Sequence, residues 1–320
     1  MKRRVARAAS AARGWVRHLR DSRAAEPGRI RLKAWAAIFG LVMAWLIAGL
    51  APSHAVVTRD RYTVTSDKVR LRLIEAGPAT GPVMLFVPGW TMPAWIWRQQ
   101  IEVFARHYHV IAMDPRGQGA SDIPSSGYDH LRRGQDIAEV ITQSGPRPVL
   151  LIGWSLGVLD ALSYVHTYGD RQIAGLVLVD NSVGEDPAPV PPPPSSPPTR
   201  RPPHAEMMRR FVTSMFRHAP DQAWLEQLIQ SCLRTPEPAA KALLAYPVPR
   251  QYWKEAVLST SRPVLYVVRP RWAAQAASLV QHRPGTETEL FADAGHALFV
   301  DEPARFNAVL DDFIRRRIWP

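Results

Sequence analysis

Short apolar runs alternate with longer segments of helical periodicity along the chain beyond residue 60. A short unbroken apolar run is typical of a buried strand, whereas apolar residues three and four positions apart are typical of a helix with one buried face. Strands are therefore expected at 68–75, 82–87, 109–113, 148–152, 173–179, 264–268 and 288–291, and helices at 94–107, 131–142, 156–168 and 303–317. This alternation predicts an α/β fold, a doubly wound and mostly parallel sheet covered by helices on both faces.

A long stretch without strand pattern separates the strands expected at 173–179 and 264–268. Three helical patterns inside it predict a helical cap over 182–261, inserted after the sixth strand between core segments 60–181 and 262–320. The cap helices are expected at 205–216, 222–233 and 237–244. An apolar stripe on the cap, typical of packing as well as of ligand contact, comprises Met207, Met208, Phe211, Met215 and Phe216.

Proline interrupts the cap at its start, where it makes up ten of the seventeen residues from 187 to 203. Such a run can neither continue a helix nor donate the hydrogen bonds of a sheet, so it is expected to be extended. A stiff spacer is one interpretation, and a docking segment for a proline-recognising partner is the other.

The N-terminal region combines a basic tail with an apolar segment. Residues 1–33 carry eleven Lys and Arg against two acids, so they hold +9 of the net charge of +12. A nucleic-acid-binding domain would spread its charge over a folded face, so this distribution argues against such a partner. The eighteen residues from 34 to 51 contain no charge and predict a transmembrane signal anchor.

The positive-inside rule places the basic tail in the cytoplasm and everything after residue 52 on the opposite, extracytoplasmic side. Two other interpretations stay open: a signal peptide cleaved after Ala55, where Ser53 and Ala55 supply small residues, and a buried helix of a soluble protein. The single cysteine, Cys232, excludes an internal disulfide.

The sequence Gly153-Trp154-Ser155-Leu156-Gly157 is the strongest chemical motif. It follows the strand expected at 148–152 and opens the helix expected at 156–168. A serine at such a strand-to-helix turn is held in a strained conformation with its hydroxyl exposed above the sheet. This context predicts that Ser155 is a nucleophile rather than an ordinary turn residue.

Three further motifs occur with this one in a characteristic order: Val87-Pro88-Gly89-Trp90, the run from Asp114 to Asp122, and Asp293-Ala294-Gly295-His296-Ala297. Together they resemble the α/β-hydrolase fold superfamily, in particular its esterase and haloperoxidase-like branch, over residues 65–318. The resemblance implies that Ser155 is the nucleophile, that His296 is the general base, and that the backbone N–H groups of Trp90 and Leu156 form the oxyanion hole. Arg116, Gly117 and Gly119 match a turn that is structural in this superfamily.

The acid of the expected triad is missing from its usual place. Most relatives carry it after the seventh strand, where this chain has Arg269-Pro270-Arg271-Trp272, and no Asp or Glu occurs from 256 to 286. A second known location follows the sixth strand, and Asp180 occupies it here. Because both strand ends open on the same edge of the sheet, Asp180 is expected to orient His296. Glu185, Asp186 and Asp293 are weaker candidates.

These features predict a membrane-anchored serine hydrolase that cleaves a small carboxylic ester through an acyl-enzyme, without metal or organic cofactor. Perhydrolysis or carbon–carbon bond hydrolysis could use the same residues. Epoxide and haloalkane hydrolysis are disfavoured, because those relatives have Asp in place of Ser155. The alternative outside enzymology is a membrane-tethered binding module on a degenerate hydrolase fold, in which the proline-rich segment recruits a partner.

Overall fold

The computed structural model describes residues 56–189 and 202–320. The predicted basic tail, the apolar segment 34–51 and most of the proline-rich segment lie outside these residues. Among the described helices, none combines the length and the apolar character needed to span a membrane.

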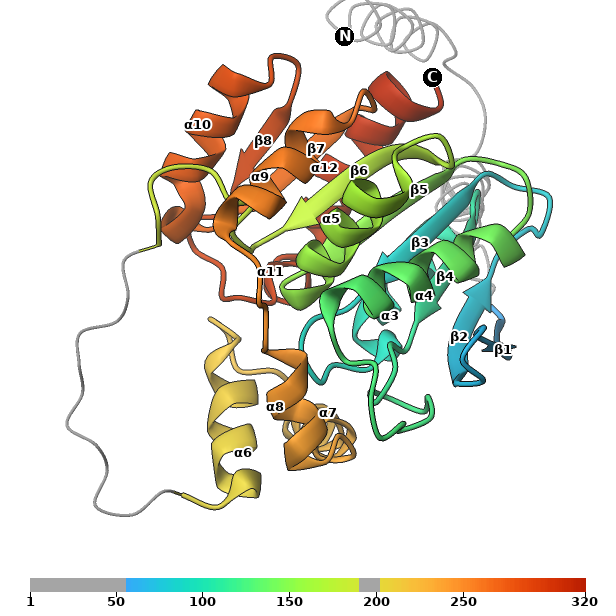
Figure 1. Ribbon diagram of the computed structural model, residues 1–320, viewed down its shortest axis with the longest axis vertical. Helices are drawn as coiled ribbons and strands as arrows, with labels where there is room; N and C mark the ends of the chain where they lie inside the picture. The colour runs from blue at the N-terminus through green and yellow to red at the C-terminus, as the bar shows by residue number, and fades with distance from the viewer. Residues whose placement is uncertain (1–55, 190–201) are drawn as a thin grey trace, which may run out of the picture. The chain divides into compact units, whose positions relative to one another are not determined.

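The core of the chain is an eight-stranded sheet in the order β1-β2-β4-β3-β5-β6-β7-β8 (Figure 1). β1 pairs antiparallel with β2 and β2 antiparallel with β4, and every later pairing is parallel. The strands are β1 (Thr58–Val64), β2 (Arg70–Ala76), β3 (Val83–Val87), β4 (His109–Met113), β5 (Val149–Trp154), β6 (Ile173–Val179), β7 (Val264–Val268) and β8 (Glu287–Leu290). The predicted α/β class and doubly wound, mostly parallel sheet are confirmed, and the first strand was not predicted.

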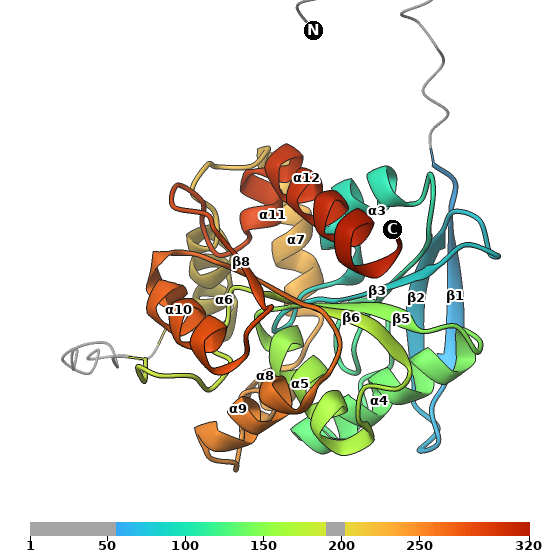
Figure 2. The same cartoon turned by 90° about the horizontal axis from the view of Figure 1, so that it is seen from above.

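Helices cover both faces of the sheet (Figure 2). Successive strand residues point to opposite faces, so Val83, Leu85 and Val87 of β3 enter one core and Met84 and Phe86 enter the other. The first core packs against α4 (His130–Gln143), α5 (Leu156–Tyr168), α9 (Arg250–Ser259) and α10 (Ala273–His282). The second packs against η1 (Ala94–Trp97), α3 (Arg98–Phe104), α11 (Leu298–Asp301) and α12 (Pro303–Phe313), which continues into η3 (Ile314–Ile318).

The insertion after β6 contains the three predicted cap helices, α6 (His204–Ser214), α7 (Gln222–Leu233) and α8 (Glu237–Leu243), at the end of the sheet opposite the C-terminus (Figure 1). α6 and Met215, the residue that follows it, contact two separate loops of the core. The Thr91 hydroxyl lies 3.6 Å from the Met208 sulfur, and the Ala297 N–H donates to the carbonyl of Met215 at 3.1 Å. The cap is therefore packed directly on the loops that follow β3 and β8.

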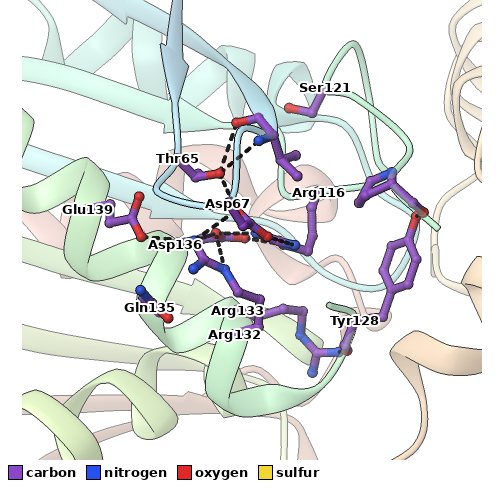
Figure 3. A network of polar contacts seen from close by, with 12 residues as sticks. Thr65, Asp67, Arg116, Ser121, Tyr128, Arg132, Arg133, Gln135, Asp136 and Glu139 are labelled. Atoms are coloured by element: carbon purple, nitrogen blue, oxygen red, sulfur yellow. Dashed lines mark hydrogen bonds and ion pairs between the residues drawn. The ribbon is translucent and has the colours of Figure 1, made fainter. Parts of the chain in front are cut away.

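A network of ion pairs centred on the buried side chain of Arg116 holds the turn after β4 (Figure 3). The Arg116 guanidinium, fully buried, donates to both carboxylate oxygens of Asp136 at 2.6 and 2.7 Å and to Asp67 at 2.9 Å. A buried guanidinium is tolerated only when its donors are satisfied. The hydrogen bond from Arg116 in turn holds the pKa of Asp67 well below its usual value.

Candidate active site

Ser155 occupies a strained turn between β5 and α5. Its φ of 54° and ψ of −119° fall in a region that non-glycine residues rarely adopt, which costs on the order of 1–3 kcal/mol. The flanking glycines make this turn possible: a β-carbon at Gly153 would collide with the carbonyl of Gly157, and one at Gly157 with the carbonyl of Val87. The turn is fixed by the Ser155 N–H, which donates to the Val179 carbonyl at 2.9 Å.

His296 lies beside Ser155 although 141 residues separate them in the chain. Its Nε2 is 2.8 Å from the Ser155 Oγ, and its backbone carbonyl accepts a hydrogen bond from the Trp154 indole at 2.8 Å. The preceding Gly295 N–H donates to Asp301 at 2.6 Å. The histidine loop is thus tied on one side to the serine turn and on the other to α11.

Asp180 completes a hydrogen-bonded chain with these two residues. Its Oδ2 lies 2.6 Å from His296 Nδ1, and its side chain is fully buried. The residue follows β6 directly with a φ of 50°, and its N–H donates to the Val267 carbonyl at 2.9 Å. The structure therefore brings the predicted Ser155, His296 and Asp180 together in the order hydroxyl, imidazole, carboxylate.

The weaker acid candidates have other surroundings. Glu185 accepts a hydrogen bond from Ser278 at 2.7 Å and lies 2.9 Å from His282 and 3.2 Å from Lys254. Asp186 is exposed and faces Lys254 at 3.7 Å. Asp293 is exposed as well. Among the described hydrogen bonds, His296 thus meets only one carboxylate, that of Asp180.

Arg269 is a residue that the sequence did not single out for this site. Its Nε donates to Asp180 Oδ2 at 2.6 Å, and its backbone N–H donates to Oδ1 at 3.0 Å. Its Nη2 lies 3.4 Å from His296 Nδ1. Its position in the sequence could have indicated this role, because Arg269 follows β7, where relatives carry the acid. The carboxyl ends of the parallel neighbours β6 and β7 are adjacent, so Arg269 and Asp180 are brought together.

The loop after β3 packs against the nucleophile turn. A β-carbon at Gly89 would lie 3.0 Å from the Ser155 β-carbon, so the backbone that carries Trp90 passes close to the serine. Thr91 has a φ of 60°, and its N–H donates to the buried side chain of Gln118. Leu156 is the first residue of α5, where backbone N–H groups lack partners within the helix. The two residues predicted to supply the oxyanion donors therefore both lie next to the serine turn, Trp90 through its neighbour Gly89 and Leu156 as the residue after Ser155, and their role stays a prediction.

The predicted apolar stripe of the cap serves mainly in packing. Met208 and Met215 are buried in the second core, and Phe211 and Phe216 pack against it. Of these, Phe211 contacts the Trp90 ring, with centroids 5.0 Å apart. Cys232 is buried too, and burial raises the pKa of its thiol to about 12. Within residues 56–189 and 202–320, no cluster of His, Cys, Asp and Glu is arranged to hold a metal ion.

Comparison with known proteins agrees with this fold. The profile described as "Alpha/beta hydrolase family" matches residues 84–309. The chain belongs to the alpha/beta hydrolase family. A non-heme chloroperoxidase from Streptomyces lividans is 35% identical over 116 residues, 36% of this chain and 42% of that protein. A pimeloyl-[acyl-carrier protein] methyl ester esterase from Vibrio parahaemolyticus is 24% identical over 252 residues, 73% of this chain and 94% of that protein.

Solved structures of this alpha/beta hydrolase family superimpose over most of the chain. A protein from Burkholderia cenocepacia, provisionally called an aryl esterase, has a TM-score of 0.69 and 28% identity over 80% of this chain and 98% of its own. An epoxide hydrolase A from Mycobacterium thermoresistibile has a TM-score of 0.65 at 22% identity, covering 82% of this chain and 99% of its own, and shows the fold alone. The relatives thus include esterases, haloperoxidases and epoxide hydrolases.

Proposed function

We propose that this alpha/beta hydrolase is a serine hydrolase that cleaves a carboxylic ester through an acyl-enzyme. The observation that carries the proposal is the hydrogen-bonded chain from Ser155 Oγ through His296 to Asp180, with distances of 2.8 and 2.6 Å. A serine hydroxyl is a weak nucleophile unless a neighbouring base removes its proton. The Asp180 contact supports the Nδ1–H tautomer, which leaves Nε2 free to accept that proton.

In the proposed reaction, Ser155 Oγ attacks the ester carbonyl carbon as its proton passes to His296 Nε2. The negative charge that develops on the carbonyl oxygen is stabilised by the N–H groups of Trp90 and Leu156, at about 3 kcal/mol for each donor. His296 then protonates the leaving alcohol, and the acyl group stays on Ser155. Water, deprotonated by the same imidazole, hydrolyses the acyl-enzyme and restores the serine.

The similarity to epoxide hydrolases carries less weight for the chemistry. Epoxide hydrolases of this superfamily use an aspartate nucleophile, and this chain has Ser155 at that position. A serine ether formed by epoxide opening could not be released by attack of water on a carbonyl, because it has none. An ester substrate gives Ser155 an intermediate that water can hydrolyse.

The test is covalent labelling of the full-length chain by a fluorophosphonate probe. The wild-type protein and the control variant Ser182→Ala are expected to be labelled, and Ser155→Ala is expected to remain unlabelled. Hydrolysis of acyl esters of increasing chain length should follow the same pattern. Equal labelling of Ser155→Ala and wild type would contradict the proposal and favour a binding module on the same fold.

We also propose that residues 34–51 anchor the chain in a membrane with the catalytic domain on the extracytoplasmic side. The support is the uncharged segment and the basic tail before it. Full-length chain is expected in the membrane fraction at its unprocessed mass of 35.8 kDa. Replacing Leu41 and Leu46 by Lys should release it, because each charge costs about 2.5–3.5 kcal/mol at a helix centre. A product that starts at Val56 would instead establish a cleaved signal peptide.

A further inference from the structure

Arg269 inverts the charge at the position where relatives carry the triad acid, and it binds the acid that this chain uses instead. Asp180 Oδ2 accepts from two donors, His296 Nδ1 and Arg269 Nε, each at 2.6 Å. Its Oδ1 accepts the Arg269 backbone N–H at 3.0 Å. The side chain of Asp180 is fully buried, whereas that of Arg269 is 27% exposed. The carboxylate is therefore held at both oxygens by a single residue.

This arrangement has a geometric consequence. A carboxylate bound only through Oδ2 could rotate about its Cβ–Cγ bond and move away from the imidazole. The two contacts from Arg269 fix the plane of the carboxylate, so that Oδ2 remains directed at His296 Nδ1. Charge-assisted hydrogen bonds of this length are among the strongest in proteins.

The same arrangement has an electrostatic consequence. Arg269 Nη2 lies 3.4 Å from His296 Nδ1, and both nitrogens are donors when Nδ1 carries its proton. The contact is then repulsive, and the repulsion grows when the ring gains its second proton and a positive charge. Asp180 attracts that charge from 2.6 Å and Arg269 opposes it from 3.4 Å, so the guanidinium offsets part of the attraction exerted by the carboxylate.

Other charged groups near the histidine loop act more weakly on the ring. Asp301, on α11, is engaged by the N–H groups of Gly295 and of Arg217 in the cap, at 2.6 and 2.8 Å. Arg217 and Asp293 are exposed, so solvent screens them. Ser155, on the remaining side, is neutral. Asp180 and Arg269 are therefore the two charged groups that the described hydrogen bonds place directly against the His296 ring.

We propose that Arg269 is a positioning residue that holds Asp180 against His296 and keeps the imidazole unprotonated to lower pH than an unopposed carboxylate would allow. This inference rests on the proposed serine hydrolase function. It explains how a buried carboxylate after β6 works beside an arginine: the guanidinium orients the acid and limits its pull on the proton of the base.

The experiment compares three full-length variants with wild type: Arg269→Gln, Arg269→Lys and Arg271→Gln. Arg271 is a matched control, because it is exposed two residues further along and stacks over Trp272 at 5.0 Å. In Arg269→Gln, the midpoint of the acid side of the kcat/KM–pH profile is expected to rise by about one pH unit, the lower end of the shift that a single close charge produces. Arg269→Lys keeps the positive charge but loses the planar guanidinium that orients the carboxylate, so kcat should fall. The midpoint of its pH profile should stay nearer to that of wild type than to that of Arg269→Gln.

An Arg269→Gln midpoint equal to that of Arg271→Gln would overturn the inference. So would an Arg269→Lys midpoint that moves as far as that of Arg269→Gln, because charge would then not be the cause. Arg269→Met, another uncharged side chain of similar length, replaces the Gln variant if thermal melting shows that the latter does not fold.

A second readout separates this inference from the proposed function. The ring nitrogens of His296 can be followed by NMR of histidine-labelled protein as pH is varied, with His296→Gln identifying the signal. If no variant and no wild-type protein turns over an ester, the proposed function fails. The expected shift of the His296 titration in Arg269→Gln still tests the electrostatic inference, and an unchanged titration curve overturns it.

Discussion

The Trp90 indole donates a hydrogen bond to the backbone carbonyl of Ala240 at 2.7 Å and thereby joins the loop after β3 to cap helix α8. The same ring contacts Phe211 of α6 edge-on. The residue predicted to supply an oxyanion donor through its backbone is therefore held by the cap through its side chain. Packing of the cap and geometry of the predicted oxyanion hole are linked at this residue.

Removing the hydrogen bond between Trp90 and the cap should lower the kcat/KM of ester hydrolysis. Trp90→Phe keeps an aromatic ring but loses the hydrogen bond, which is worth about 1 kcal/mol. A loss of this size in the transition state corresponds to a roughly fivefold fall in kcat/KM, measured on a short acyl ester. Trp95→Phe is the control, since Trp95 contacts Trp224 of the cap edge-on but belongs to η1 rather than to the loop residues beside Ser155. Equal activity of both variants would contradict the link.

Neutralising the acid should separate Asp180 from its sequence rivals. Asp180→Asn removes the charge that stabilises the imidazolium and permits the wrong tautomer, so kcat is expected to fall by about ten-thousand-fold. Glu185→Gln and Asp186→Asn should stay within a few fold of wild type, because these side chains face Ser278, His282 and Lys254 instead. Steady-state ester hydrolysis gives the measurement. A large loss in Glu185→Gln with an active Asp180→Asn would reject Asp180 as the acid.

A substitution that relieves the backbone strain at Ser155 should raise the free energy of unfolding. Glycine adopts a φ of 54° without the steric cost that serine bears there. Ser155→Gly is therefore expected to raise the free energy of unfolding by about 1 kcal/mol over Ser155→Ala, after the larger chain entropy of unfolded glycine is deducted. Both variants lack the hydroxyl, so urea unfolding of the pair isolates the backbone term. A less stable glycine variant would show that the turn stores no strain.

The network around Arg116 predicts a dependence of stability on pH. The folded-state pKa of Asp67 is lowered, chiefly by the hydrogen bond from Arg116. Ionised Asp67 therefore stabilises the fold above pH about 4, the usual pKa of an aspartate in an unfolded chain. This contribution is lost as the pH falls through the lower pKa that Asp67 has in the folded state. Since the Asp67 side chain is 39% exposed, the contribution at pH 7 should be about 1 kcal/mol or less.

Asp67→Asn should consequently unfold at lower denaturant than wild type at pH 7, and the gap should narrow below pH 4. Asp60→Asn is the control, because Asp60 pairs with Arg72 from a half-exposed position. A gap that widens in acid would contradict the sign of the Asp67 effect.

The sequence predicted most of the sheet because buried parallel strands are continuous apolar runs, a local signal. β1 escaped detection because it is an edge strand whose consecutive charged residues Arg59, Asp60 and Arg61 interrupt any apolar run. α9 and α10 were missed too, because each buries only a narrow face against the sheet. The secondary structure of β1, α9 and α10 is stabilised by contacts with neighbouring elements rather than by a local sequence pattern.

The candidate active site likewise has a part that local sequence determines and a part that only the tertiary structure determines. The sequence by itself determined the turn at Ser155, because the steric need for Gly153 and Gly157 acts between residues close in the chain. It also narrowed the acid to Asp180 and three rivals. Only the tertiary structure decided which carboxylate meets His296 and that Arg269 holds it, since hydrogen bonds reach about 3 Å and these residues come from three strand ends far apart in sequence.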